Sequence, residues 1–329
     1  MKNSNLSTLL LQWYQEHGRD LPWREKGGAH HDPYAVLISE VMLQQTTVAT
    51  VIPFFERFMQ RFPTIQSLAQ TSIEEVYKYW QGLGYYTRAR SLHATAQIIA
   101  NQGWPQTLKE ALKLKGLGTY TAASFLALAF NHPETVVDGN VIRIICRLYH
   151  LKQPVKEILP QIHELAEKIT DKKNPADYAS AIMDLGALIC TPKNPQCLLC
   201  PWQKHCQSFG KKDIEEIPLR EQPQKIEKKG FVYLIFNSKG EIFIRKRTEK
   251  GLLSGLWEFP WDDSPDLQVN AQKTDKSVTH IFTHIKLTLQ ICICQSNTPP
   301  TEGIFVSPSS LTDYPMSTLM KKIAKTAQI

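Results

Sequence analysis

The chain of 329 residues is long enough for two domains, each able to bury a core of its own. Lys and Arg number 38 against 31 Asp and Glu, so the net charge is +7, a mildly basic balance that suits nucleic acid. No run of about eighteen apolar residues occurs and the start lacks a signal-peptide cleavage site, so we expect neither a membrane span nor a secretory leader. With seven cysteines, we expect a metal site in a reducing compartment, the cytoplasm, rather than disulfides.

Residues 1–212 have helical patterns almost throughout, and one predicted helix carries a single carboxylate. Asp32 and Pro33 form a favourable cap and first-turn pair, and the helix that they begin is strongly apolar around Glu40. A lone Glu on a helix usually faces solvent. Here the apolar flanks predict partial burial, which raises the pKa of a carboxyl group and makes Glu40 a candidate general acid at neutral pH.

Two glycine turns repeat along this helical region. Gly82 and Gly84 bracket the first, and Gly116 and Gly118 bracket the second. Glycine permits positive φ and close backbone approach, and the amides that open the following helix can bind a phosphate. An ordinary helix connection explains each turn about as well by itself. Because Arg88 follows the first turn beside two tyrosines, we favour contact with a nucleic-acid backbone there.

A second acidic candidate follows the second glycine turn. Asp138 lies in the sequence Val-Val-Asp-Gly-Asn, after an apolar helix and a proline turn. A carboxylate at this point could face the sugar of the nucleotide whose phosphate the turn binds. The alternative interpretation is that Asp138 only caps the helix that follows it.

Four cysteines end the helical region with the spacing C-x6-C-x2-C-x5-C. They are Cys190, Cys197, Cys200 and Cys206. Four thiolates in so short a span predict a metal site, and the residues by themselves leave structural zinc and an iron–sulfur cluster both open. Lys193, in the loop after the first cysteine, could meet a phosphate.

The pattern changes beyond residue 212. Residues 213–229 are charged and contain proline, as is typical of a linker. From residue 230 apolar residues alternate with polar ones, which predicts strands, with a hairpin at residues 237–240. Residues 230–329 are therefore predicted to form a small antiparallel sheet with a helix near Met320.

These patterns resemble the helix-hairpin-helix DNA glycosylases of the endonuclease III superfamily, and within it the adenine DNA glycosylases. The resemblance rests on the glycine turns, Asp138, the cysteine spacing and the stretch 39–46, and it covers nearly the whole chain. It implies a mainly α fold: a helix-hairpin-helix domain over 1–212 with one [4Fe-4S] cluster in the cysteine loop, then a Nudix-like α+β domain. The stretch 251–260 supports that last domain, but no Nudix metal box follows, so we expect no pyrophosphohydrolase activity.

Tyr120 distinguishes a monofunctional hydrolase from a bifunctional glycosylase-lyase. Bifunctional relatives carry a lysine at this place, whose amine attacks the sugar to form a Schiff base, and tyrosine has no amine for that step. The resemblance therefore implies a monofunctional hydrolase that releases adenine opposite 8-oxoguanine or guanine in double-stranded DNA. The alternatives are a pyrimidine glycosylase-lyase and a non-enzymatic iron–sulfur DNA sensor; Tyr120 argues against the first, and the paired Glu40 and Asp138 argue against the second.

The resemblance also implies roles for single residues in a monomeric, DNA-associated enzyme. Once the base is flipped out, Glu40 protonates adenine at N7 and Asp138 stabilises the oxocarbenium sugar. Tyr120 and Asn140 support Asp138. The residues expected to bind the substrate are Arg24 at the flipped adenine, Gln44, Gln45 and Tyr86 at the lesion pair, and Phe282, Thr283 and His284 at the oxidised base. Those expected at the DNA backbone are Gly82, Gly84, Arg88, Gly116, Gly118 and Lys193.

Gln44 and Gln45 have a simpler alternative, and Ser180 differs from the residue that relatives often have at its place. Gln44 and Gln45 could also be no more than a polar helix end. Ser180 stands where relatives often have Gln or Glu near the adenine pocket, so a water would replace a direct contact to the base.

Overall fold

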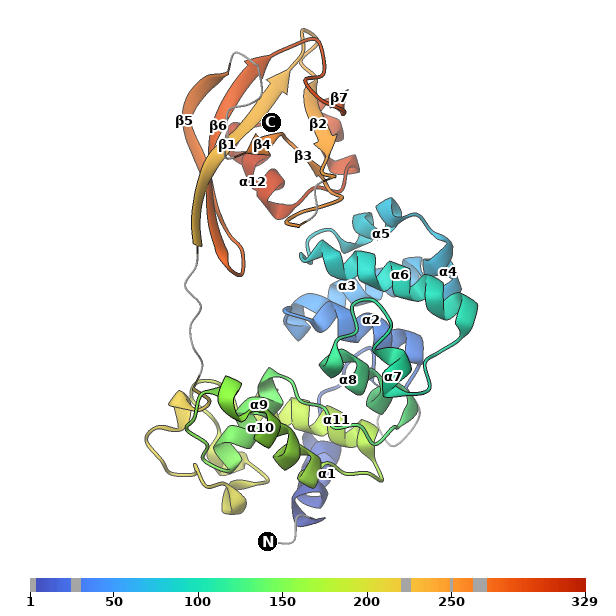
Figure 1. Cartoon of the computed structure of the whole chain (residues 1–329), viewed down its shortest axis with the longest axis vertical. Helices are drawn as coiled ribbons and strands as arrows, with labels where there is room; N and C mark the ends of the chain where they lie inside the picture. Colours follow the sequence, from blue (N-terminus) through green and yellow to red (C-terminus); the bar gives the residue numbers. More distant parts are fainter. Residues whose placement is uncertain (1–3, 25–30, 220–225, 249–250, 263–270) are drawn as a thin grey trace. The chain divides into compact units, whose positions relative to one another are not determined.

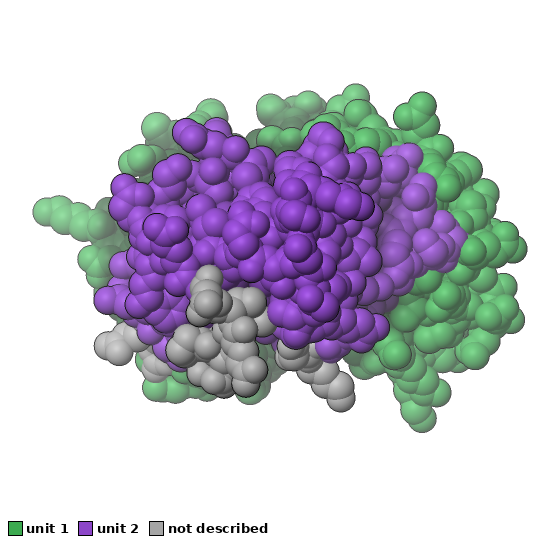
Figure 2. Space-filling view, turned by 90° about the horizontal axis from the view of Figure 1, so that it is seen from above, with its two compact units in different colours: residues 1–70, 91–221 green, residues 71–90, 222–329 purple. Residues whose placement is uncertain are grey.

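The computed structural model describes residues 4–24, 31–219, 226–248, 251–262 and 271–329. Contacts divide the chain into two compact units, residues 1–70 with 91–221 and residues 71–90 with 222–329 (Figure 2). The domain boundaries expected near residues 212 and 230 remain predictions. No helix in the described ranges is long and apolar enough to cross a membrane.

The first unit is helical, as predicted (Figure 1). Its α-helices are α1 (Ser4–His17), α2 (Pro33–Leu43), α3 (Val48–Arg61), α4 (Ile65–Gln70), α7 (Leu108–Ala111), α8 (Thr119–Phe130), α9 (Gly139–Leu148), α10 (Val155–Ile169) and α11 (Pro175–Asp184). Helix α6 (Tyr86–Gln102) begins in the second unit and continues in the first.

Two helices of this unit are apolar on nearly every side. The predicted cap of α2 is present, because the Asp32 carboxylate accepts hydrogen bonds from the backbone N–H groups of Tyr34 and Ala35. Both α2 and α8 are buried along most of their length and pack against each other. A helix that is apolar all round belongs in the interior, so polar side chains on these two helices are enclosed with it.

A second core joins α1, α9, α10 and α11 to the cysteine loop. Leu10, Ile145 and Ile162 are fully buried there. Trp202, from the loop, is 2% exposed and donates its indole N–H to the carbonyl of Leu6 at 2.8 Å. The cysteine loop is therefore packed against the helices.

The second unit contains helix α5 (Ile73–Trp80), a sheet and helix α12 (Thr318–Ala327). The strands are β1 (Ile226–Phe236), β2 (Ile242–Lys246), β3 (Trp257–Glu258), β4 (Trp261–Asp262), β5 (Gln272–Ile281), β6 (Ile285–Gln295) and β7 (Ile304–Val306). The main path runs β3-β2-β1-β6-β5, with β4 added to β1 and β7 to β2. Helix α12 packs on one face through Leu319, Met320 and Ile323.

The predicted hairpin and C-terminal helix are confirmed, but the prediction of an antiparallel sheet is wrong in one respect. Strands β1 and β2 pair antiparallel around the turn at residues 237–240. Strands β1 and β6 instead run parallel along their whole length (Figure 1). Alternation along a strand predicts only which face is buried, and the direction of a distant partner strand is set by the connections between them.

Candidate active site

One cavity in the helical unit brings the predicted catalytic residues together. Its volume is about 680 Å³, and Glu40, Tyr120, Asp138 and Asn140 all line it. Glu40 comes from α2, Tyr120 from the first turn of α8, and Asp138 is the cap of α9. Arg24 lines the same cavity.

Glu40 is held in a nearly water-free position. It is 4% exposed, and Oε2 has no hydrogen-bond partner within the described part of the chain. Burial raises the pKa of Glu40 to about 7, although the nearby Ser124 hydroxyl and the Arg24 guanidinium partly oppose this rise. The predicted burial is confirmed, and a large fraction of Glu40 is protonated at neutral pH.

Asp138 both caps a helix and faces the cavity, so the two interpretations of this residue are compatible. Its Oδ1 accepts the backbone N–H of Val141 at 2.7 Å, and its Oδ2 accepts the side-chain N–H of Asn140 at 2.9 Å. These two hydrogen bonds engage both oxygens of the Asp138 side chain. Asn140 therefore holds Asp138 in one orientation on the cavity wall.

Tyr120 completes the group as a neutral phenol. Its hydroxyl lies 3.5 Å from Sδ of Met183. Burial, with the nearby carboxyl groups of Glu40 and Asp138, raises the pKa of Tyr120 far above its ordinary value. The side chain can therefore donate a hydrogen bond but cannot serve as a base or an amine nucleophile at neutral pH.

A buried ionic cluster that the sequence did not predict borders the cavity through its two arginines. Asp184, 0% exposed, accepts hydrogen bonds from Nε and Nη2 of Arg19 at 2.8 and 2.6 Å and from Nη1 of Arg24 at 2.9 Å. Arg19 lines the cavity beside Arg24. The available signal was weak, since Arg19 and Asp184 are 165 residues apart. Ser180, one turn before Asp184, is fully buried and is not among the residues that line this cavity.

A π-helix at residues 185–189 follows directly after Asp184, and Cys190 is its C-cap. Gly186, on this π-helix, packs against Asn140, and a Cβ at Gly186 would lie 2.6 Å from the Cβ of Asn140. Arg143 of α9 donates to the side-chain oxygen of Asn140 and to the carbonyls of Gly186 and Cys190. The wall that holds Asp138 is thus continuous with the first cysteine of the loop.

We expect Gly186→Ala to reduce base release by about 100-fold, because an added methyl group must displace Asn140 and a shift of about 1 Å at a catalytic group has costs of that size. Single-turnover kinetics would measure the loss. The absorbance of the iron–sulfur cluster serves as the control for folding. A variant with unchanged rate and normal absorbance would contradict this account of Gly186.

The four predicted metal-binding cysteines surround a small cavity of about 30 Å³ together with Arg147. All four are free thiols, and burial raises the pKa of Cys200 to about 12. No three Cys, His, Asp or Glu side chains among the described residues are grouped as ligands of one ion. Thiols that surround a space with a buried cation beside it suit a negatively charged cluster.

In the second glycine turn Gly116 has the predicted positive φ, whereas Gly118 has φ of −74°. Gly116 has φ of 84°, and a Cβ there would also lie 2.7 Å from Cβ of Ser91. Gly118 is the N-cap of α8. Gln44 donates to the carbonyl of Gly116 and the hydroxyl of Thr121, so it supports this turn, whereas Gln45 is exposed and has φ of 62°.

Two predictions around the first glycine turn need correction. Arg88 is 7% exposed and donates to the carbonyls of Leu83 and Gly84, so it holds the turn from inside instead of reaching a phosphate. Tyr86 is 6% exposed and packs edge-on against Tyr77, whereas Tyr85 is 46% exposed. The surface aromatic residue is therefore Tyr85. Sequence alone could not choose between neighbours, because the positive φ of Tyr85 decides which ring points outward.

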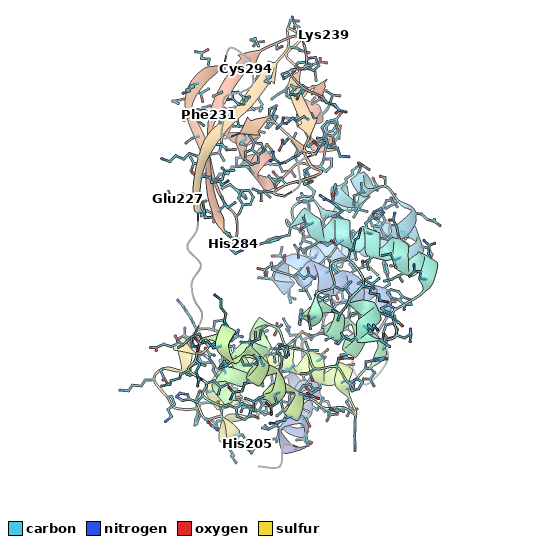
Figure 3. All side chains as sticks on the ribbon, in the orientation of Figure 1. His205, Glu227, Phe231, Lys239, His284 and Cys294 are labelled. Atoms are coloured by element: carbon cyan, nitrogen blue, oxygen red, sulfur yellow. The ribbon has the colours of Figure 1, made fainter. Side chains whose placement is uncertain are left out.

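The three residues expected at the oxidised base lie at the tip of the β5–β6 hairpin, where Figure 3 labels His284. Phe282 is half-buried against His280, with ring centroids 4.6 Å apart, and Thr283 and His284 are exposed. The Thr283 hydroxyl lies 3.0 Å from the Tyr85 hydroxyl. Aromatic and hydroxyl groups thus gather at one exposed point of the second unit. Lys193 is exposed in the cysteine loop.

Comparison with known proteins agrees with this arrangement. Residues 38–168 match the HhH-GPD superfamily of base excision DNA repair proteins, residues 190–206 the iron-sulfur binding domain of endonuclease III, and residues 231–326 a NUDIX domain. The chain is 37% identical over 298 residues to the adenine DNA glycosylase of Buchnera aphidicola subsp. Schizaphis graminum, and the match covers 85% of each protein. The chain belongs to the adenine DNA glycosylase family. It is also 33% identical over 399 residues to the human adenine DNA glycosylase, covering 97% of this chain and 73% of that protein.

A solved structure described as a thermostable thymine-DNA glycosylase shares the helical fold, with a TM-score of 0.56, 29% identity and coverage of 63% of this chain and 96% of that one. As a member of the adenine DNA glycosylase family, this chain is a DNA glycosylase with a helix-hairpin-helix domain, a Nudix-like domain and a [4Fe-4S] cluster. The prediction of fold class and cofactor is confirmed, and structural zinc is set aside.

Proposed function

We propose that this glycosylase hydrolyses the N-glycosidic bond of adenine opposite 8-oxoguanine or guanine in double-stranded DNA. The observation that carries the proposal is that Glu40, with a pKa of about 7, and Asp138, held by two donors, line one cavity. A carboxylic acid and a carboxylate that face one substrate are the pair that glycoside cleavage requires. The adenine DNA glycosylases that match this chain support the choice of base.

The proposed reaction begins when adenine is flipped out of the duplex into the cavity, at a cost of a few kcal/mol that is smallest at a mispair. Glu40 donates its proton to N7, and the electrons of the bond between C1′ and N9 leave with the neutral base. Asp138 stabilises the cationic sugar until water adds to C1′. Tyr120 and Asn140 keep Asp138 in place, and Arg24 contacts the base.

Base release should leave the DNA strand intact. Tyr120 stands where a lysine would form a Schiff base, and its phenol cannot supply an amine. Among the described residues that line the cavity there is no lysine. We therefore propose a monofunctional enzyme, acting as a monomer, in which the [4Fe-4S] cluster supports the fold of the cysteine loop through Cys190, Cys197, Cys200 and Cys206.

We further propose that the exposed tip at residues 282–284 reads the partner base and that Tyr85 inserts at the same lesion pair. Aromatic rings stack on bases, and the hydroxyl of Thr283 can exchange its contact with Tyr85 for one to an oxidised base. The remaining DNA contacts are assigned to Gln44, Gln45 and Lys193 and to the turns at residues 82–84 and 116–118. Gln44 would contact the DNA while its side chain also supports the second glycine turn.

Single-turnover kinetics on otherwise identical duplexes test the proposed function. Adenine opposite 8-oxoguanine, guanine or cytosine and thymine opposite guanine are compared, each with and without borohydride. We expect release of adenine in the order 8-oxoguanine, guanine, cytosine, with no trapped adduct. Release of thymine, or a covalent adduct with borohydride, would contradict the proposal.

The contribution of the hairpin tip is separable from the chemistry. Thr283→Val keeps the shape of the side chain and removes the hydroxyl, so we expect a loss of about 10-fold in the preference for 8-oxoguanine over guanine, in line with about 1–3 kcal/mol for a lost base contact. Thr279→Val, on strand β5 of the same hairpin and in contact with Thr288, is the matched control. An equal loss in both variants would indicate only a destabilised sheet.

A further inference from the structure

Two members of the ionic cluster beside the cavity, Asp184 and Arg19, have no part in the reaction as described so far. Asp184 receives five hydrogen bonds shorter than 3 Å: from the backbone N–H, Nε and Nη2 of Arg19, and from Nη1 of Arg24 to both of its oxygens. Its side chain is fully buried, and those of Arg19 and Arg24 are 23% and 7% exposed. Both arginines line the cavity that contains Glu40 and Asp138.

Such a cluster costs free energy to bury. Two guanidinium groups and one carboxylate leave a net positive charge, and the desolvation of buried ions often exceeds their mutual attraction. Asp184 also lies at the junction between α11 and the π-helix at residues 185–189, a feature that occurs frequently at functional sites. Because this cluster costs free energy to bury and lies at such a junction, a role in function explains it better than a role in stability.

We propose that Asp184 is the positioning residue of the base pocket: it holds Arg19 and Arg24 side by side as one wall of N–H donors for the acceptor nitrogens of the flipped base. Each guanidinium carries five N–H donors in a rigid plane, so its orientation is set once part of the plane is bound. The inference rests on the proposed function and extends it to two residues outside the catalytic pair.

The same contacts govern the charge near Glu40. Arg24, Asp138, Tyr120 and Ser124 face Glu40 directly, and Arg19 and His31 line the same cavity. A guanidinium near Glu40 favours the ionised carboxylate, which cannot donate a proton. Asp184 offsets this effect because it neutralises part of the charge of both arginines. Without Asp184 the charge of Arg24 would be less compensated, and it would lower the pKa of Glu40 further.

Asp184→Asn tests the proposal, since it keeps the shape of the side chain and removes the charge. We expect adenine release at neutral pH to fall by about 10- to 100-fold, the usual range when a group that orients a site residue is lost. The decline of the rate with rising pH should begin at a lower pH than in the unmodified enzyme, because Glu40 then loses its proton earlier. The variant should also bind a duplex with uncleavable 2′-fluoro-2′-deoxyadenosine more weakly.

Asp171→Asn is the matched control, because Asp171 precedes α11 and accepts the backbone N–H groups of Lys173 and Asn174 at the surface. In an Arg19→Gln and Arg24→Gln background, Asp184→Asn should have little further effect. If Asp184→Asn does not fold, as judged by cluster absorbance, Arg19→Lys and Arg24→Lys replace it: each keeps the charge but loses the rigid plane, so the rate should fall without a shifted pH profile.

Unchanged rate and pH profile in Asp184→Asn, while the unmodified enzyme releases adenine, would overturn the inference and leave the proposed function intact. A rate loss with an unshifted profile and normal binding of the 2′-fluoro duplex would also overturn it. If the unmodified enzyme releases no adenine, the proposed function fails, and binding of the 2′-fluoro duplex decides the role of Asp184 by itself.

Discussion

Glu40→Gln is expected to lower the rate of adenine release by a factor of about 10² to 10⁴, the usual contribution of a positioned general acid. Gln has almost the same shape but no proton to give, so binding of the flipped base should change little. Glu56→Gln, on the exposed face of α3, is the control. The unmodified enzyme should lose activity as the pH rises through about 7, where Glu40 ionises.

The same substitution should stabilise the protein in alkaline solution. The pKa of Glu40 is raised from 4.5 in a free side chain to about 7, so the folded state binds the proton more tightly than the unfolded state. Stability from this group is therefore full below pH 4.5 and is lost as the pH rises through 7. A shift of this size corresponds to about 3 kcal/mol, at about 1.4 kcal/mol for each pH unit.

We expect Glu40→Gln to unfold at a higher temperature than the unmodified enzyme at pH 8 and at nearly the same temperature at pH 4.5. Thermal denaturation at the two pH values measures the difference. Activity that is unchanged in the variant would remove Glu40 from the mechanism. Equal denaturation temperatures at pH 8 would instead show that the carboxyl group is better solvated than its burial indicates.

Arg147→Met is expected to have the largest effect on stability, about 3 kcal/mol or more, and to release the iron–sulfur cluster. Arg147 is 1% exposed and donates to the carbonyls of Ile217, Thr191 and Pro192. Its Nη1 also lies 3.6 Å from Sγ of Cys190. Met fills the space but leaves these acceptors without a donor, and each costs about 1–3 kcal/mol.

Iron content and denaturant unfolding would measure the effect of Arg147→Met. Arg147→Lys is the matched variant: it keeps a positive charge beside the sulfur atoms but cannot serve acceptors in several directions at once, so an intermediate loss is expected. If Arg147→Lys were as stable as the unmodified protein, charge alone would explain the residue. If Arg147→Met kept both its iron and its stability, the hydrogen bonds of Arg147 would be dispensable.

Local patterns in the sequence predicted several features because each depends on neighbours along the chain. The helix begun by Asp32 and Pro33 is apolar all round, so Glu40 within it had to be buried. The cysteine spacing alone defines a site in a short loop. The turn at residues 237–240 predicts the β1–β2 hairpin for the same reason.

Residues that depend on distant partners could not be predicted in this way. Arg88 follows a glycine turn as a DNA-binding residue would, yet the folded turn places its guanidinium against the carbonyls of Leu83 and Gly84. Which of Tyr85 and Tyr86 is exposed depends on the backbone φ of Tyr85. The parallel pairing of β1 with β6 depends on the path of about fifty intervening residues.

The sequence by itself predicted the helical first region, a four-cysteine metal loop and the burial of Glu40, because apolar periodicity, short ligand spacing and apolar neighbours all act over a few turns of chain. Only the tertiary structure decided that Glu40, Asp138 and Asn140 share one cavity and that Asp184 binds two arginines beside them. Contacts between residues more than a hundred positions apart depend on packing of whole helices, and no pattern along the chain records that packing.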